Sequence, residues 1–386
     1  MKREIPLSVP NLDAEIVDYL RECIQTGWVS TGGGFISEFE KRMADYIGME
    51  ETVSMQSGTA ALHLSLRILG IQPGDEVIVP TLTFIAAVNP VAYAGAHPVF
   101  MDCDEFFCMD CGKLERFLAE ECQSTEDGLR NKTTGRKVSA IIPVHVFGNL
   151  CDMERIMALA ETYGLKVLED ATEAVGSRWE EGAYAGRYGG TVGDMGVYSF
   201  NANKIITTGG GGMILSSRKE YLDRARYLGL QAKNDSLHFV HDQIGYNYRM
   251  LNLQAALGVS QIGRLEDFIK VKQRNYRLYQ SLLKDVKGLR LLPFGGGRPN
   301  CWFYALLVEE EAFGLSRDEL MNRLIRKGIQ CRPVWKLIHS QKPYEGCQAY
   351  RIEQAAFYEK NVLNIPCSTN LTEEDAEWVV SAIKMK

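Results

Sequence analysis

Residues 59–80 read TAALHLSLRILGIQPGDEVIVP, which is a helical pattern, a turn and a strand pattern in succession. Three leucines recur at the i, i+4, i+7 spacing of one helix face, and this spacing predicts a helix over 59–69. The Pro-Gly pair that follows supplies a turn, and the β-branched run at 76–79 predicts a strand. A helix that turns directly into a buried strand is the repeating unit of an α/β fold.

The same alternation continues along the chain from about residue 52 to 215 and predicts a largely parallel sheet covered by helices. Beyond about residue 260, helical patterns and an isolated strand at 302–308 predict a smaller α+β domain. We therefore expect a large domain over 1–260, with an N-terminal arm over 1–30, and a small domain over 261–386. The further strands expected in the large domain are 98–101, 139–144, 166–169, 196–200 and 213–215.

The composition excludes several classes of protein. A net charge of -6 argues against a general nucleic-acid-binding surface. No stretch approaches the roughly 20 apolar residues that span a bilayer, and the N-terminus lacks the apolar core of a secretion signal, so we expect a cytoplasmic protein without a membrane partner. The polar stretch 120–137 is too charged to join a core and is expected to be a surface excursion.

The chain has ten cysteines, which a cytoplasmic setting keeps reduced, so no disulfide framework is expected. Three of them have the C-x4-C-x2-C spacing of an iron–sulfur site, with a conceivable fourth ligand further on. No glycine-rich ligand loop follows them, and the spacing of His238 and His241 is weak evidence for zinc. We expect no metal. The four cysteines are Cys103, Cys108, Cys111 and Cys122.

Residues 199–212, SFNANKIITTGGGG, place Lys204 just past a predicted strand and before four glycines. Glycines let the backbone approach a ligand closely. A lysine in such a place can form a Schiff base with an aldehyde cofactor, and a lowered pKa would activate its amine. The alternative is a solvated loop lysine, which is the commoner role of a lysine beside a glycine run.

Asp170 follows the apolar strand predicted at 166–169. Ligands of open α/β sheets bind at the carboxyl ends of strands. A carboxylate there can keep the nitrogen of a pyridinium cofactor protonated, so that the ring accepts electrons. The alternative is an acid that caps a following helix.

Two further segments lie at the ends of predicted elements. Ser57, Gly58 and Thr59 open the helix at 59–69, where free N–H groups and the helix dipole suit a phosphate. Ser57 is equally well suited to be a simple N-cap. Phe84 follows the strand at 76–79 and can stack on a flat ring, although an isolated Phe is more often a core residue.

These segments occur in the order phosphate loop, aromatic residue, strand-end Asp, then Ser and Lys, and the combination is far more specific than its parts. With this combination of segments, the chain resembles the fold-type-I pyridoxal-phosphate (PLP) enzymes. Among them, it resembles the DegT/DnrJ/EryC1/StrS family of sugar aminotransferases over nearly its whole length. The segments that carry the resemblance are 57–62 (SGTAAL), 169–171 (EDA), 199–200 (SF), Lys204 and 245–249 (GYNYR).

The resemblance implies an aspartate-aminotransferase-like fold with pyridoxal 5'-phosphate as cofactor. Lys204 would form the Schiff base, Asp170 would pair with the pyridine nitrogen and Phe84 would stack on the ring. Family members place a Glu, Gln or His beside the cofactor at the position of Glu173. The phosphate would be bound by Gly58, Thr59 and Ser199.

An asparagine at the position of Asn247 reaches the phosphate of the neighbouring subunit in the family, so the resemblance also implies a homodimer with shared active sites. Two segments resemble those that surround the nucleotide sugar in the family, and four of their residues are candidates for substrate contact. Trp28 has packing as an equally good alternative role. The candidates are Trp28, Ser30, Arg332 and His339.

Residues 201–208 (NANKIITT) and 231–233 (QAK) are similar to the branch that acts on UDP-4-keto-6-deoxy-N-acetylglucosamine in bacillosamine and legionaminic acid pathways. Asn201 stands where many other members have His, and Ala202 where the branch commonly has Gly. The resemblance implies amino transfer from L-glutamate to C4 of that sugar.

Three alternatives remain open. Within the enzymes, amination at C3 or of a dTDP- or GDP-linked keto sugar is the second choice. A non-enzymatic alternative is a catalytically silent PLP-binding regulator. A nicotinamide dehydrogenase is disfavoured, because no G-x-G-x-x-G follows an early strand.

Overall fold

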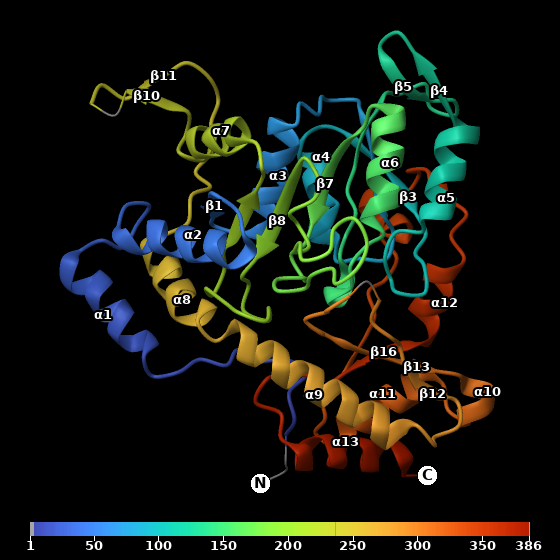
Figure 1. Cartoon of the computed structure of the whole chain (residues 1–386). Coiled ribbons are helices and arrows are strands. Elements are labelled where there is room, and N and C mark those ends of the chain that lie inside the picture. Colours follow the sequence, from blue (N-terminus) through green and yellow to red (C-terminus); the bar gives the residue numbers. More distant parts are fainter. Residues whose placement is uncertain (1–3, 236, 296, 386) are drawn as a thin grey trace.

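The computed structural model describes residues 4–235, 237–295 and 297–385, which form two units, each with its own main sheet (Figure 1). The larger unit occupies the upper part of Figure 1, and the smaller one, in orange and red, lies below it. The long helix α9 (Leu265–Leu283) runs along the smaller unit, beside the C-terminal helix α13 (Glu373–Lys384).

The large sheet has eight strands, and β9 is antiparallel to both of its neighbours, while the strands from β8 to β15 pair in parallel. All six strands expected from the sequence are present. The largest difference is at 139–144, where the strand ends at Ile141. The strands, in sheet order, are β1 (Thr52–Met55), β9 (Gly212–Leu215), β8 (Met195–Ser199), β7 (Lys166–Asp170), β6 (Val138–Ile141), β2 (Glu76–Pro80), β3 (His97–Met101) and β15 (Ala349–Tyr350).

Helix α3 (Gly58–Ile68) confirms the helix expected at 59–69 and packs against β7, β8 and β9. It is buried on almost every side, because the sheet covers one face while α4 and α7 cover others. Its N-terminus is thereby held at the ends of the central strands. The other helices of this unit are α1 (Ile16–Thr26), α2 (Gly34–Ile47), α4 (Asn89–Tyr93), α5 (Cys111–Arg116), α6 (Met153–Tyr163), α7 (Lys219–Gly229) and α8 (Asn252–Ile262).

The smaller unit corrects the expectation of an isolated strand at 302–308. That strand is β13 (Tyr304–Val308), and it lies inside a four-stranded antiparallel sheet in the order β12-β13-β16-β14. The other three strands of this sheet are only two to four residues long, too short to leave a periodic pattern. They are β12 (Leu289–Leu291), β16 (Val362–Ile365) and β14 (Arg332–Pro333), and the remaining helices are α10 (Glu310–Phe313), α11 (Arg317–Arg326) and α12 (Gln354–Asn361).

The chain crosses between the two units at both ends. Ile5 exchanges backbone hydrogen bonds of 2.9 and 2.8 Å with residues 328 and 330 of the smaller unit, although it belongs to the predicted N-terminal arm. Residues 1–3 of that arm lie outside the described residues. In the other direction, β15 brings residues from the C-terminal part to the edge of the large sheet. Neither unit is therefore a single continuous stretch of chain.

The polar stretch 120–137 forms a hairpin, β4 (Cys122–Thr125) and β5 (Gly128–Asn131), that projects at the upper right of Figure 1. The expectation that none of it joins the core is wrong. Leu129 is buried, and the buried Asn131 donates a hydrogen bond from Nδ2 to Glu76 Oε2 at 2.8 Å. In β5, the buried Leu129 and Asn131 alternate with the less buried Gly128 and Arg130, so one face of this strand anchors the hairpin.

The ten cysteines are free thiols, and nine of them, including the four considered for a cluster, are buried. Within the described residues, no group of three or more His, Cys, Asp or Glu side chains is arranged to hold a metal ion. His238 Nδ1 lies 2.8 Å from Asp235 Oδ2, and His241 Nδ1 lies 2.8 Å from the Gln231 carbonyl. Among the helices of the described residues, none is both long and apolar enough to cross a bilayer.

Candidate active site

A cavity of about 910 Å³ opens at the carboxyl ends of β7 and β8, beside the N-terminus of α3. The smaller unit closes it with residues 302–303 and 330–336. A separate cavity of about 500 Å³ contains none of the predicted site residues and lies among charged groups, including Lys113, Asp152 and Arg155. The larger cavity brings together eight of the residues predicted from the sequence: Gly58, Thr59, Phe84, Asp170, Glu173, Ser199, Lys204 and Arg332.

Lys204 lies in the loop after β8, with its side chain 11% exposed. Its Nζ is 3.8 Å from Glu173 Oε1 and 3.9 Å from the centre of the Trp302 ring. Burial lowers the pKa of Lys204, and the negative charges of Glu173 and Asp170 oppose that shift. A lysine whose pKa is lowered keeps more of its amine neutral and nucleophilic near neutral pH. This surrounding contradicts the alternative of a solvated loop lysine.

Asp170 is the last residue of β7 and is only 2% exposed. Its Oδ1 accepts a hydrogen bond from the N–H of Thr172 at 3.0 Å, which closes a turn. The next element in the described chain is β8, so the alternative of a helix cap is wrong. Burial raises the pKa of Asp170, against the effect of hydrogen bonds from Thr172 and of the charge on Lys204. A cation beside this carboxylate would stabilise its charged form.

Glu173 faces the cavity from the turn after Asp170 and is 4% exposed. Its Oε2 accepts a hydrogen bond from the N–H of Phe147 at 2.8 Å, while Oε1 is directed toward Lys204. Burial raises the pKa of Glu173 to about 7, and the charge of Lys204 opposes this rise. Burial thus lets Glu173 keep its proton at a higher pH than an exposed glutamate does.

The start of α3 forms a cradle for an anion. Ser57 is the N-cap, and its Oγ accepts a hydrogen bond from the N–H of Ala60 at 3.1 Å. The N–H groups of Gly58 and Thr59, in the first turn, have no partner within the helix. A Cβ added to Gly58 would lie 2.9 Å from Ser199 Cβ, and one added to Gly212 would lie 2.6 Å from Gly58 N. Glycine is therefore required where these backbones meet.

The donor set of this cavity fits pyridoxal phosphate. Helix N–H groups and two hydroxyls, those of Thr59 and Ser199, suit the phosphate. The buried Asp170 carboxylate, which no ammonium or guanidinium group contacts within ion-pair distance in the described residues, suits a protonated ring nitrogen. Phe84, which is 53% exposed, presents an apolar wall. A buried lysine amine completes the set.

Four predicted residues lie elsewhere in this chain: the described lining of the cavity does not contain Trp28, Ser30, Asn247 or His339. Trp28 is 59% exposed, and the Ser30 carbonyl accepts a hydrogen bond from the backbone N–H of Asn252 at 2.7 Å. Asn247 is exposed on the segment that pairs with Leu230. His339 Nδ1 lies 2.6 Å from Thr81 Oγ1, and Thr81 is not among the described lining residues either.

The sequence analysis missed Trp302, Phe147 and Asn300. Trp302 contacts Lys204 through its ring, and its Nε1–H donates a hydrogen bond to the Asn203 carbonyl at 2.7 Å. In the sequence, it is one aromatic residue at the start of an apolar strand, the usual pattern of a core residue. Its contact with Lys204 spans 98 positions of the chain, which no local pattern records.

The profile of the DegT/DnrJ/EryC1/StrS aminotransferase family matches residues 10–384. The GDP-perosamine synthase of Caulobacter vibrioides is 37% identical over 382 residues, which cover 98% of this chain and 97% of the relative. That of Escherichia coli O157:H7 is 35% identical over 98% of this chain and 97% of the relative. A Streptococcus pneumoniae protein assigned as a sugar aminotransferase, Spr1654 in its PLP form, has a TM-score of 0.86 at 25% identity, covering 99% and 98% of the two chains.

Proposed function

Because the chain belongs to the DegT/DnrJ/EryC1/StrS aminotransferase family and depends on pyridoxal phosphate, we propose that it transfers an amino group from L-glutamate to C4 of a nucleotide-linked 4-keto-6-deoxy sugar. One observation carries the proposal. The buried amine of Lys204 lies in a cavity that also contains the strand-end carboxylate of Asp170 and the N-terminus of α3. The cavity, at about 910 Å³, is within the range of small-molecule sites.

Pyridoxal phosphate, when bound, supplies an aldehyde that accepts the amino group and a ring that withdraws electrons from the substrate carbon. Gly58, Thr59 and Ser199 would hold the phosphate, and Phe84 would pack on the ring. Asp170 would hold a proton at the ring nitrogen, which its buried carboxylate attracts. Lys204 supplies the amine that binds the cofactor and, once released, carries a proton to or from the substrate carbon.

Two nucleotide sugars are candidates. Residues 201–208 and 231–233 favour UDP-4-keto-6-deoxy-N-acetylglucosamine, through their resemblance to the bacillosamine branch. The names of the two relatives at 37% and 35% identity favour a GDP-linked sugar instead. Arg332, on the cavity wall, suits the diphosphate that both sugars carry.

We expect the purified protein to aminate one of these two sugars at C4 with glutamate as donor. The measurement offers each 4-keto sugar, linked to UDP, GDP or dTDP, and records the product by proton NMR. The position of the nitrogen follows from the H4 signal, and its coupling is expected to show an equatorial amine. Nitrogen on C3, or turnover of the dTDP sugar alone, contradicts the proposed substrate and leaves the cofactor chemistry unaffected.

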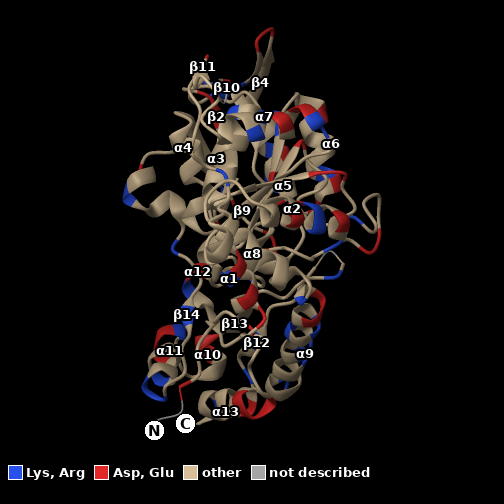
Figure 2. Cartoon of the chain, turned by 90° about the vertical axis from the view of Figure 1, so that its left-hand side faces the viewer, with Lys and Arg blue, Asp and Glu red and all other residues tan. Residues whose placement is uncertain are grey.

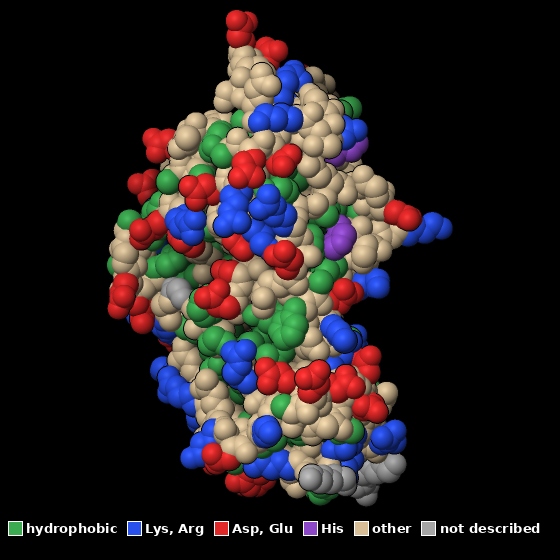
Figure 3. Space-filling view, turned by 90° about the vertical axis from the view of Figure 1, so that its right-hand side faces the viewer, with side chains coloured by type: hydrophobic (Ala, Val, Ile, Leu, Met, Phe, Trp, Pro, Cys, Tyr) green, Lys and Arg blue, Asp and Glu red, His purple; other side chains and the backbone are tan. Residues whose placement is uncertain are grey.

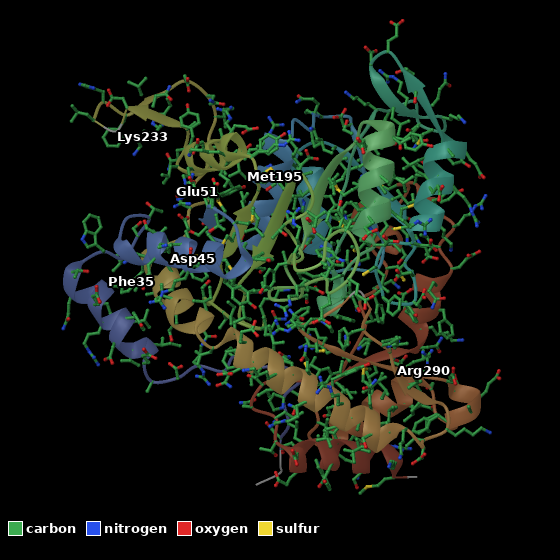
Figure 4. All side chains as sticks on the ribbon, in the orientation of Figure 1. Phe35, Asp45, Glu51, Met195, Lys233 and Arg290 are labelled. Atoms are coloured by element: carbon green, nitrogen blue, oxygen red, sulfur yellow. The ribbon has the colours of Figure 1, made fainter. Side chains whose placement is uncertain are left out.

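We further propose a homodimer with shared active sites. Large apolar side chains are exposed on the side that carries α1 and the hairpin β10 (Lys233–Asp235) and β11 (Val240–His241). Figure 2 views this side and shows α8 mostly without charged residues, and Figure 4 shows the hairpin, with Lys233 labelled, standing away from the body. The opposite side, in Figure 3, carries many charges of both signs. The exposed residues include Ile24, Trp28, Leu237, Phe239, Val240 and Ile244.

This arrangement explains how Asn247, exposed in one chain, can serve a phosphate bound in the other. Trp28 and Ser30 would likewise face the substrate of the neighbouring chain, while Arg332 would serve the substrate of its own. The pairing buries apolar surface that a monomer would leave in water.

Mixing Asn247→Ala protein with Lys204→Ala protein is therefore expected to restore activity. Each variant alone has two damaged sites, whereas a mixed dimer has one site in which both residues are intact. Reversible unfolding of the mixture allows exchange, and amino transfer is then compared with that of each parent. Mixed dimers that recover no activity above either parent contradict shared sites.

A further inference from the structure

The Lys204 amine and the Glu173 carboxyl face each other inside the cavity, with Nζ 3.8 Å from Oε1. Both groups are buried, and the charged groups that face Glu173 are Lys204, from the loop after β8, and Asp170, from the end of β7. Among the described residues, Glu173 is within ion-pair distance of the Lys204 amine and Asp170 is not, so Glu173 is the carboxyl whose free oxygen is directed at the amine.

The loop 146–148 is built to fix the other oxygen of Glu173. Phe147 has a φ of 58°, a left-handed conformation that non-glycine residues seldom adopt, and in it the Phe147 N–H donates to Glu173 Oε2 at 2.8 Å. Strained backbone at a buried polar contact is typical of functional sites. The Phe147 ring is held by Trp335, with ring centres 4.9 Å apart.

The residue next to Phe147 shows how closely this loop is packed. Gly148 has a φ of 93°, and a Cβ there would lie 1.9 Å from Asn300 Oδ1. Asn300 in turn donates hydrogen bonds from Nδ2 to the carbonyls of Glu173 and Val175, at 2.9 and 3.0 Å. Side chain and backbone of Glu173 are thus both held, and only Oε1 is left for the amine.

We propose that Glu173 is a catalytic residue that exchanges a proton with Lys204. This inference rests on the proposed function, because only amino transfer requires the Lys204 amine to lose and regain a proton in each cycle. In the forward step, a proton leaves Nζ and binds Oε1, so that the N–H electron pair stays on nitrogen as its lone pair. An ion pair becomes a neutral amine and a neutral acid, and the reverse step returns the proton.

The burial of the pair favours this exchange. A buried ion pair loses part of the solvation of both charges, which the neutral pair does not need. Burial raises the pKa of Glu173 to about 7 and lowers that of Lys204, so the two values approach each other. Close pKa values are the condition for efficient proton transfer. The flexible stem of Lys204 allows Nζ to come within hydrogen-bond distance of Oε1.

The test measures the pKa of Lys204 in protein freed of cofactor. Acetic anhydride labels neutral amines, and mass spectrometry of the Lys204 peptide gives the labelling rate at each pH. Glu173→Gln removes the charge that stabilises the ammonium form, so the pKa of Lys204 should fall. The labelling is compared above pH 7, where Glu173 carries its charge, and below both pKa values of Lys204. There, each unit of that fall raises labelling by about tenfold, and we expect at least one unit.

Two further variants complete the comparison. Glu173→Asp keeps the charge but withdraws it by one methylene, and should give a smaller rise in labelling. Glu76→Gln is the matched control, because Glu76 is also a buried glutamate. It begins β2, does not line the cavity, and accepts a hydrogen bond at Oε1 from the Thr134 hydroxyl. It should label Lys204 as the wild type does.

In the enzyme loaded with cofactor, Glu173→Gln should lower kcat of the glutamate half-reaction by about 10²-fold, the lower end for a lost acid–base group, and leave KM nearly unchanged. Unchanged labelling of Lys204 in Glu173→Gln protein whose circular dichroism matches the wild type overturns the proposal. A wild type that transfers no amino group overturns the proposed function instead, because the labelling result does not depend on turnover.

Discussion

Replacing Lys204 with alanine is expected to lower the rate of amino transfer by at least about 10⁴-fold, since one side chain supplies both the nucleophilic amine and the proton carrier. Among the described residues that line the cavity, Lys204 is the lysine beside Asp170 and Glu173. The cavity lining also contains Lys336, on the wall formed by 330–336, but its side chain is largely exposed. The fold should survive, because removing a buried amine also removes the cost of burying its charge. The measurement is the loss of glutamate in a single half-reaction.

Lys270→Ala is the control for this variant. Lys270 is exposed on α9 and, among the residues that the structure describes, pairs only with Asp267 three residues earlier, so its removal should leave the rate unchanged. Full activity of Lys204→Ala without added amine contradicts the role of Lys204. A wild type that binds the cofactor but exchanges no amino group with glutamate indicates a silent regulator, the non-enzymatic alternative.

Asp170→Asn is expected to slow amino transfer by about 10²–10³-fold, the usual cost of losing one preorganised electrostatic partner. The variant keeps the shape of the site and the hydrogen bond that Oδ1 accepts from Thr172, at 3.0 Å. An uncharged amide, however, does not attract a proton to the ring nitrogen. Cofactor should therefore remain bound, which absorbance of the purified variant checks, while stopped-flow measurement of the half-reaction records the loss.

Asp152→Asn is the control that separates the proposed role of Asp170 at the ring nitrogen from a purely structural role of an aspartate in its own turn. Asp152 is the N-cap of α6 and accepts a hydrogen bond from the N–H of Arg155 at 3.1 Å. Asn caps a helix about as well as Asp does, so this variant should keep the wild-type rate. Wild-type turnover in Asp170→Asn as well would mean that Asp170, too, serves only its turn.

The elements of the large sheet were predictable because each carries its own periodicity. The strands at 76–79 and 166–169 each have an apolar centre and, apart from the partly buried Lys166, are buried on both faces, as strands between two layers of helices must be. β15 is two residues long and pairs with β3 across some 250 positions of the chain, so nothing near it in the sequence predicts a strand. The same holds for the short partners of β13.

The candidate site divides along the same line. Gly58, Asp170 and Lys204 were found because parallel strands and the helices between them end at a common edge, so residues at those ends meet. The distance of 3.8 Å between Lys204 Nζ and Glu173 Oε1, by contrast, could not be predicted from the position of either residue in the sequence. The contribution of Trp28 and Asn247 to an active site depends on how two chains pair, so it stays a prediction.

The sequence by itself determined six strands of the large sheet, the helix α3, the family and the cofactor, because periodicity and short motifs are properties of neighbouring residues. Only the tertiary structure decided what surrounds the Lys204 amine. The Trp302 ring comes from the smaller unit, and the Phe147 N–H reaches Glu173 from a left-handed turn packed on Asn300. Burial and proton affinity are set by all atoms within a few ångströms, and packing brings those atoms from distant parts of the chain.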